Sequence, residues 1–164
     1  MTPQVKLPAG YTLRTALPDD AETIQAQRDA MFADMGKEVH KVEAVSATAL
    51  GWHRRMLQVG LYEGVLMHAG ADIVAGAGLL WRDWPPNPDT AEQTRAYLLN
   101  VYVQPQHRGQ GLAWVLVQTL LTRCASRGVN IVSLHASEAG RPIYEGLGFR
   151  ASSEMELLLP EGIC

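Results

Sequence analysis

The spacing of apolar and polar residues changes from a period of two to a helical period early in the chain, and it predicts a strand followed by two helices. Residues 11–16 alternate, which is typical of a strand. Residues 18–20, Pro-Asp-Asp, are typical of a helix start, and the apolar face that follows is expected to end near Gly36. Arg28 interrupts that face, either as a side chain that reaches solvent or as one that points into a binding cleft. A second helix is predicted over residues 42–58.

From the middle of the chain onward, strand patterns and helix patterns alternate. Residues 62–69 and 72–81 are predicted to form two strands joined by a turn, and the prolines of residues 83–89 predict a loop. The remaining predicted elements are a strand over 96–103, a helix over 111–126, a strand over 130–136, a helix over 138–147, and a last strand that opens at Phe149, runs through Leu157 and ends at Pro160. This order indicates one α/β domain over residues 1–164.

Composition and charge exclude several classes of protein. The 164 residues are 47% hydrophobic and 19% charged, which is ordinary for a globular protein, and the net charge of -3 argues against a general nucleic-acid binder. Cys124 and Cys164 cannot form a disulfide framework, and no cluster of cysteine and histidine suits a metal ion, so we expect a cytoplasmic location and no metal. No apolar run approaches the ~20 residues of a membrane span, and the N-terminus lacks a signal-peptide pattern.

The most specific chemical signal is a glycine loop, Gln106-His107-Arg108-Gly109-Gln110-Gly111, placed between a predicted strand and a predicted helix. A helix start carries unpaired N–H groups and a partial positive charge, which suit a diphosphate. The two glycines permit close approach of phosphates, and the arginine adds a positive charge. A glycine turn without a ligand is the alternative. The lysine of a P-loop is absent, and Trp114 stands where a dinucleotide fingerprint requires a third glycine or alanine.

This loop and a second motif together resemble the GNAT family of N-acetyltransferases. Gln106, Gly109 and Gly111 match the acetyl-CoA motif of that family, Gln/Arg-x-x-Gly-x-Gly/Ala. Tyr144, followed shortly by a Gly-Phe pair at residues 148–149, matches its second signature. The order of elements also agrees, so the resemblance covers nearly the whole chain. It implies a mixed central sheet flanked by helices, in which two central strands splay apart and admit acetyl-CoA between them.

The resemblance also implies where acetyl-CoA would bind. The cleft would lie between the strand that ends at Val103 and the strand that ends at Ala136, and backbone groups of Val101 to Val103, Tyr102 included, would pair with pantetheine as an added strand does. Ser137 stands where many members carry an asparagine, and a small residue there can still line the cofactor. Backbone N–H groups would bind the diphosphate, and these belong to Arg108, Gly109, Gln110, Gly111, Leu112 and Ala113.

Acetyl transfer from a thioester to an amine requires a neutral amine and a proton for the departing thiolate. Tyr144 is the predicted general acid, because of its place ahead of the Gly-Phe pair. The base stays open, since residues 97–102 contain no carboxylate. His135, near the end of the adjoining strand, is one candidate. A water chain ordered by Asn100 or by a backbone carbonyl is the other.

The predicted function is transfer of acetyl from acetyl-CoA to a primary amine of a small molecule or peptide, by direct attack in a ternary complex. Asp34 and Glu38 either attract the cationic amine or belong to an exposed polar face. An acyl-CoA-binding sensor without turnover is the alternative from another class, and transfer to a protein N-terminus or lysine is a third. The acceptor is left open, and a homodimer is compatible with the resemblance. No nucleic-acid or membrane partner is expected.

Overall fold

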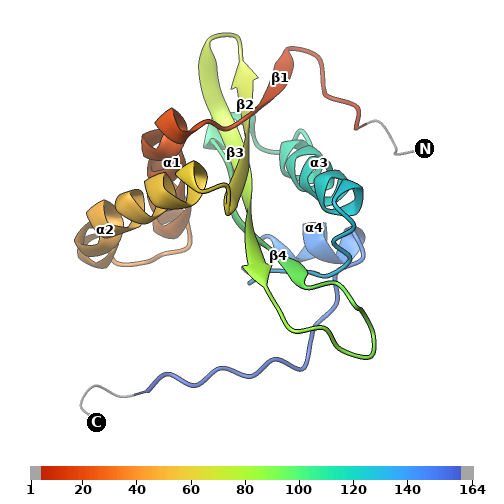
Figure 1. Cartoon of the computed structure of the whole chain (residues 1–164). Coiled ribbons are helices and arrows are strands. Elements are labelled where there is room, and N and C mark those ends of the chain that lie inside the picture. The colour runs from red at the N-terminus through yellow and green to blue at the C-terminus, as the bar shows by residue number, and fades with distance from the viewer. Residues whose placement is uncertain (1–4, 160–164) are drawn as a thin grey trace.

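The computed structural model describes residues 5–159 and shows a five-stranded sheet with helices on both faces (Figure 1). The strands lie side by side in chain order, β1 to β4 antiparallel and β4 to β5 parallel, which confirms the predicted mixed α/β sheet. Helices α1 and α2 cover one face of the sheet, and α3 and α4 cover the other. The elements are β1 (Tyr11–Thr15), η1 (Pro18–Asp20), α1 (Ala21–Asp34), α2 (Val39–Gln58), β2 (Tyr62–Ala69), β3 (Asp72–Asp83), β4 (Thr94–Val103), η2 (Pro105–His107), α3 (Leu112–Ser126), β5 (Val132–Ser133) and α4 (Arg141–Gly146).

Burial on both faces explains why the central strands are nearly continuous apolar runs. In β2, Val65 and Met67 belong to the apolar cluster beneath α3, whereas Leu66 belongs to the cluster beneath α1 and α2. Cys124 lies in the first of these clusters, as its place in an apolar helical run predicts. The central strands therefore pack against helices on both faces, and the side chains that they carry are fixed relative to both helix layers.

A β-bulge bends β4 in its second half. Gly78 pairs with Leu99 and Gly76 with Tyr102, so β4 has two residues, Asn100 and Val101, where β3 has one. Asn100 has a φ of 57°, in the left-handed region that asparagine tolerates better than most side chains. An extra residue of this kind increases the local twist and redirects a side chain.

The other edge of β4 is mostly without a partner. Its pairing with β5 is limited to Ala96 with Val132 and Tyr97 with Ser133. From residue 98 to residue 103, no described strand pairs with this edge. The strands therefore part midway along β4, as the resemblance implied.

Three predicted elements of the C-terminal third need correction. The strand expected over 130–136 is only β5, and the helix expected from residue 138 begins at Arg141. The last strand, expected from Phe149 through Leu157, is wrong: residues 150–159 are exposed and form no strand. A strand needs a neighbour for its backbone groups, and this tail runs away from the sheet (Figure 1). Its expected end, Pro160, and Cys164 lie outside the described residues.

None of the helices in residues 5–159 is long and apolar enough to cross a membrane. Nor do those residues bring together three or more histidine, cysteine, aspartate or glutamate side chains that could hold a metal ion.

Candidate active site

The glycine loop and the start of α3 present a series of unbonded backbone N–H groups. Gly109 and Gly111 both have a φ of 76°, a conformation that glycine adopts without strain. The Arg108 N–H donates to the Pro105 carbonyl at 3.3 Å, and the first bond of the helix runs from Val115 N–H to the Gly111 carbonyl at 3.1 Å. Between them, the N–H groups of residues 109–114 have no acceptor within the described part of the chain. This arrangement fits an anion such as a diphosphate.

The side chain of Arg108 holds this loop in place through a hydrogen bond and an ion pair. Its Nε donates to the Val103 carbonyl at 2.8 Å, and its guanidinium forms an ion pair with Asp34 at the end of α1. The guanidinium centre also lies 5.7 Å from the centre of the Tyr102 ring. Arg108 thus joins the loop to β4 and α1. The N–H groups that follow Arg108, including those of Gln110, Leu112 and Ala113, form the candidate diphosphate cradle.

The two acidic residues considered for amine attraction are paired within the chain. Asp34 is bound to Arg108, and Glu38 lies 2.8 Å from the Lys41 ammonium. Both pairs are at least partly exposed, where an ion pair contributes little to stability. The exposed polar face is therefore the better interpretation of these two positions.

Tyr144 lies on α4, with its half-buried ring packed against the core and its hydroxyl without a hydrogen-bond partner among the described residues. The ring packs edge-to-face against Phe149, with centroids 5.9 Å apart. Its hydroxyl makes no hydrogen bond to any described residue, and burial raises the pKa of the phenol. The side chain is therefore protonated at neutral pH and has a free donor, which is the state that a general acid requires.

Ser137 and Gly140 shape the turn that leads to Tyr144. The Ser137 hydroxyl accepts the Gly140 N–H at 3.1 Å, so it orders the turn before α4. A Cβ at Gly140 would lie 3.0 Å from Cε2 of Tyr144, closer than side chains normally approach. The absence of a side chain at residue 140 therefore leaves room for the tyrosine ring.

Asn100 is buried at the centre of a polar cluster that joins both helices to the sheet. Its amide nitrogen lies 2.9 Å from Nε2 of His53 and 3.1 Å from the Tyr62 hydroxyl, and its oxygen accepts from Arg28 at 2.6 Å. Nδ1 of His53 donates to the Ala49 carbonyl at 2.9 Å, which assigns Nε2 as the acceptor for Asn100. Burial lowers the pKa of His53 and raises that of Tyr62 to about 12. Both rings are therefore neutral.

His53 and Tyr62 were not singled out from the sequence. Both fit the apolar patterns of their helix and strand, and the only signal was a titratable ring at a position where the pattern requires burial. A buried histidine needs partners for its ring nitrogens. Asn100 supplies one, but the sequence does not show that α2 and β4 meet there.

His135 is exposed and lies just beyond the point where β4 and β5 pair. Its Nδ1 is hydrogen-bonded to the Tyr97 hydroxyl, and its Nε2 is 3.8 Å from the Glu156 carboxylate. The Arg82 guanidinium stacks on the Tyr97 ring at 4.4 Å, and burial raises the pKa of that tyrosine. His135, one candidate for the base, is thus open to solvent, whereas Asn100, which was expected to order a water chain, is enclosed.

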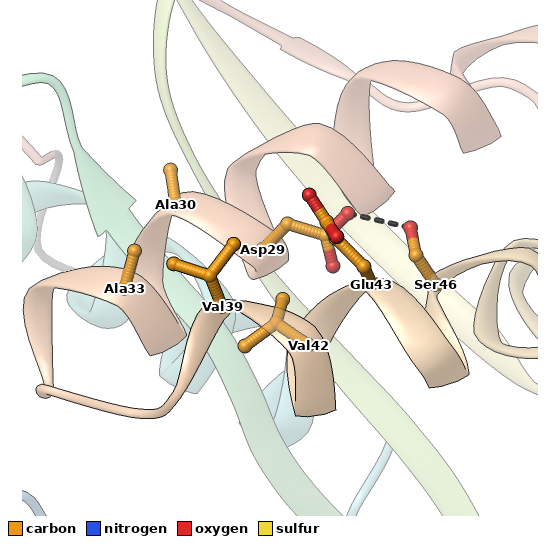
Figure 2. A pocket seen from close by; sticks show the side chains of 7 residues that line it. All are labelled: Asp29, Ala30, Ala33, Val39, Val42, Glu43 and Ser46. Carbon is orange, nitrogen blue, oxygen red and sulfur yellow. Dashed lines mark hydrogen bonds between the residues drawn. The ribbon is translucent and has the colours of Figure 1, made fainter.

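A hollow of about 280 Å³ lies between α1 and α2 (Figure 2). In it, the Ser46 hydroxyl donates to the Asp29 carboxylate at 2.6 Å. The residues that line it are Asp29, Ala30, Ala33, Val39, Val42, Glu43 and Ser46. None of them belongs to the glycine loop, β4 or α4, so the hollow is separate from the candidate active site.

A mixed sheet that parts beside a glycine loop and a helix start is the arrangement that the resemblance implied for an acyl-CoA-binding α/β protein. The chain belongs to the acetyltransferase (GNAT) domain family, whose family model matches residues 32–157. Acetyl-CoA is the acyl donor of that family.

Solved structures and a characterised relative agree with this assignment. A GCN5-related N-acetyltransferase from Ralstonia eutropha superposes with a TM-score of 0.88 at 33% identity, over 92% of this chain and 99% of that one. A predicted acetyltransferase from Clostridium acetobutylicum, solved with acetyl-CoA, shares the fold with a TM-score of 0.85 at 24% identity, over 91% and 96%. Glucosamine 6-phosphate N-acetyltransferase of Trypanosoma brucei brucei is 31% identical over 94 residues, which are 57% of this chain and 63% of that relative.

Proposed function

We propose that this protein is a single-domain, cytoplasmic N-acetyltransferase that passes acetyl from acetyl-CoA to a primary amine of a small molecule or peptide. One observation carries the proposal: the unbonded N–H groups of residues 109–114 follow, after the short turn η2, a strand whose edge is unpaired from residue 98 to residue 103. The first feature suits a diphosphate, and the second suits an extended polar arm such as pantetheine. The free, buried thiol of Cys124 is consistent with a reducing compartment.

The donor supplies the thioester, and the acceptor amine attacks it directly in a ternary complex. Tyr144 donates a proton to the departing sulfur, because its hydroxyl is protonated and unbonded. His135 receives the proton of the amine and passes it to solvent, since its ring is exposed and already hydrogen-bonded to Tyr97. Asn100 acts by holding the bulge of β4, because both N–H donors and the oxygen of its amide are engaged by other side chains.

The test is release of the CoA thiol from acetyl-CoA in the presence of a panel of amines. The panel contains glucosamine 6-phosphate, the substrate in the name of the trypanosomal relative, with amino sugars, amino acids, polyamines and short peptides. Turnover on one class of acceptor supports the proposal. Binding of acetyl-CoA without turnover on any acceptor favours the sensor, which the absence of a carboxylate in residues 97–102 keeps as the second candidate.

Replacing Gly111 by valine is expected to raise the Kd of CoA by about tenfold or more. A branched side chain at a φ of 76° is strained, and relief of that strain turns the neighbouring N–H groups away from the diphosphate. Titration calorimetry with CoA measures the effect. Gly128→Val is the matched control, since Gly128 has a φ of 73° at the opposite end of α3. Equal weakening of CoA binding in both variants would contradict the proposal that the N–H groups of residues 109–114 bind the diphosphate.

The exposed tail supports a homodimer as the quaternary state. Four large apolar side chains in residues 150–159 have high relative exposure: Met155 94%, Leu157 79%, Leu158 83% and Leu159 72%. Such a patch is costly in water, and alternate apolar residues on an extended segment are typical of an added strand. A second copy of this chain covers the patch in the proposed dimer, each tail packing on its partner.

Replacing both Met155 and Leu157 by aspartate is expected to convert the dimer to a monomer. The charges make burial of the tail against a second copy unfavourable. Size-exclusion chromatography with light scattering gives the mass directly. Val39→Asp with Val45→Asp is the control, because these exposed apolar residues lie on α2. A wild-type protein that is monomeric at micromolar concentration would overturn the proposed dimer.

A further inference from the structure

Arg28 is a partly buried cation that forms no ion pair with any described residue. It extends from α1 toward β4, where its Nη1 donates to Asn100, and its guanidinium stacks on the Phe32 ring at 4.6 Å. The adjacent carboxylate of Asp29 is engaged elsewhere, accepting from Gln25 at 2.8 Å and from Ser46 (Figure 2). The sequence left two interpretations of Arg28, and the structure places it against the sheet.

The surroundings of Arg28 compensate its charge only in part. The Asp29 carboxylate is near enough to favour the cation, but the opposing effect of burial is larger. Its one side-chain hydrogen bond is to a neutral amide, and the rings of His53 and Tyr62 beyond that amide are neutral. Burial disfavours the charged guanidinium and lowers its pKa, although an arginine remains protonated. A desolvated cation with unused donors is stabilised when a carboxylate or phosphate binds it in a bidentate manner.

Arg28 also lies close to the candidate active site. Its partner Asn100 forms the bulge of β4, and the unpaired edge of that strand is where the acyl donor is proposed to bind. Tyr97, the hydrogen-bond partner of His135, is also near enough to Arg28 for the two side chains to interact electrostatically. A group bound at Arg28 is thus on the α1–α2 face of the strand that presents the acetyl group.

We propose that Arg28 binds an anionic group of the acceptor, a carboxylate or a phosphate, so that the acceptors are amines that also carry a negative charge. The inference rests on the proposed acetyltransferase function and specifies its substrate class. The polar cluster of Asn100, His53 and Tyr62 orients the guanidinium by fixing the amide oxygen that accepts from Arg28.

The kinetic test compares acceptors that carry an anionic group with counterparts that lack it. Alanine is paired with alaninamide to test a carboxylate, and phosphoethanolamine is paired with ethanolamine to test a phosphate. The wild type is expected to prefer the anionic member of at least one pair by about tenfold in kcat/KM, and Arg28→Gln is expected to lose that preference through KM. Arg28→Lys is expected to retain part of the preference for the anionic acceptor, because the positive charge remains. Arg54→Gln is the control, because Arg54 pairs with Glu22 on an exposed surface.

A binding measurement keeps the inference testable apart from turnover. With the diphosphate cradle saturated by CoA, inorganic phosphate is expected to raise the Tm of the wild type and of Arg54→Gln, but not of Arg28→Gln. An equal rise in all three proteins, or neutral acceptors that match the anionic ones in both pairs, would overturn the anion site. Failure of acetyl-CoA to bind or react at all would instead overturn the proposed function, so the two failures are distinguishable.

Discussion

Replacing Tyr144 by phenylalanine is expected to lower kcat by about 10²–10⁴-fold while leaving the affinity for acetyl-CoA nearly unchanged. The substitution removes only the hydroxyl, which bonds to no described residue, and the ring keeps its packing against Phe149 and Gly140. Burial raises the pKa of the phenol, so the hydroxyl holds its proton over the neutral range and is available to the departing thiolate. Steady-state rates with a saturating acceptor, beside a Kd for CoA, measure the two quantities.

The fold of this variant provides the control for its activity. A Tm within about 2 °C of the wild type indicates that the lost rate reflects chemistry, since phenylalanine fills nearly the same volume. A kcat within about twofold of the wild type would mean that the thiolate takes its proton from solvent. Tyr144 would then be a packing residue of α4, as its contact with Phe149 permits.

The parts of the site that the sequence predicted are those fixed by local chemistry. Gly109 and Gly111 were expected to allow phosphates to approach, and both adopt a positive φ at the start of α3. The hairpin of β2 and β3 followed from two apolar runs joined by a turn at residues 70–71. Each of these features depends on a few consecutive residues, and turn residues carry a specific backbone preference.

The parts that the sequence did not predict depend on contacts between distant segments. The bulge at Asn100 arises from the register of β4 against β3, and no local pattern specifies that register. The tail shows the converse case. Its alternation around Met155 and Leu157 is typical of a strand, yet a strand forms only where another strand is available to pair with it.

Replacing Asn100 by alanine is expected to lower the free energy of unfolding by on the order of 3 kcal/mol. The amide serves Arg28, His53 and Tyr62 at once, and its loss leaves buried polar atoms of all three without that partner. Alanine at a φ of 57° adds roughly 1 kcal/mol of backbone strain. Urea unfolding monitored by circular dichroism measures the sum, provided that the transition is two-state.

Asn100→Gly separates the two contributions, because glycine adopts a φ of 57° without strain but also lacks the amide. The glycine variant should therefore recover about 1 kcal/mol relative to alanine and remain well below the wild type. A glycine variant as stable as the wild type would show that the cluster contributes no net stability.

The Asn100→Gly variant also tests the acceptor site. If Asn100 orients Arg28, the KM of this variant for an anionic amine rises, while its KM for the neutral counterpart does not. Stability and acceptor preference would then both depend on one residue of the β4 bulge.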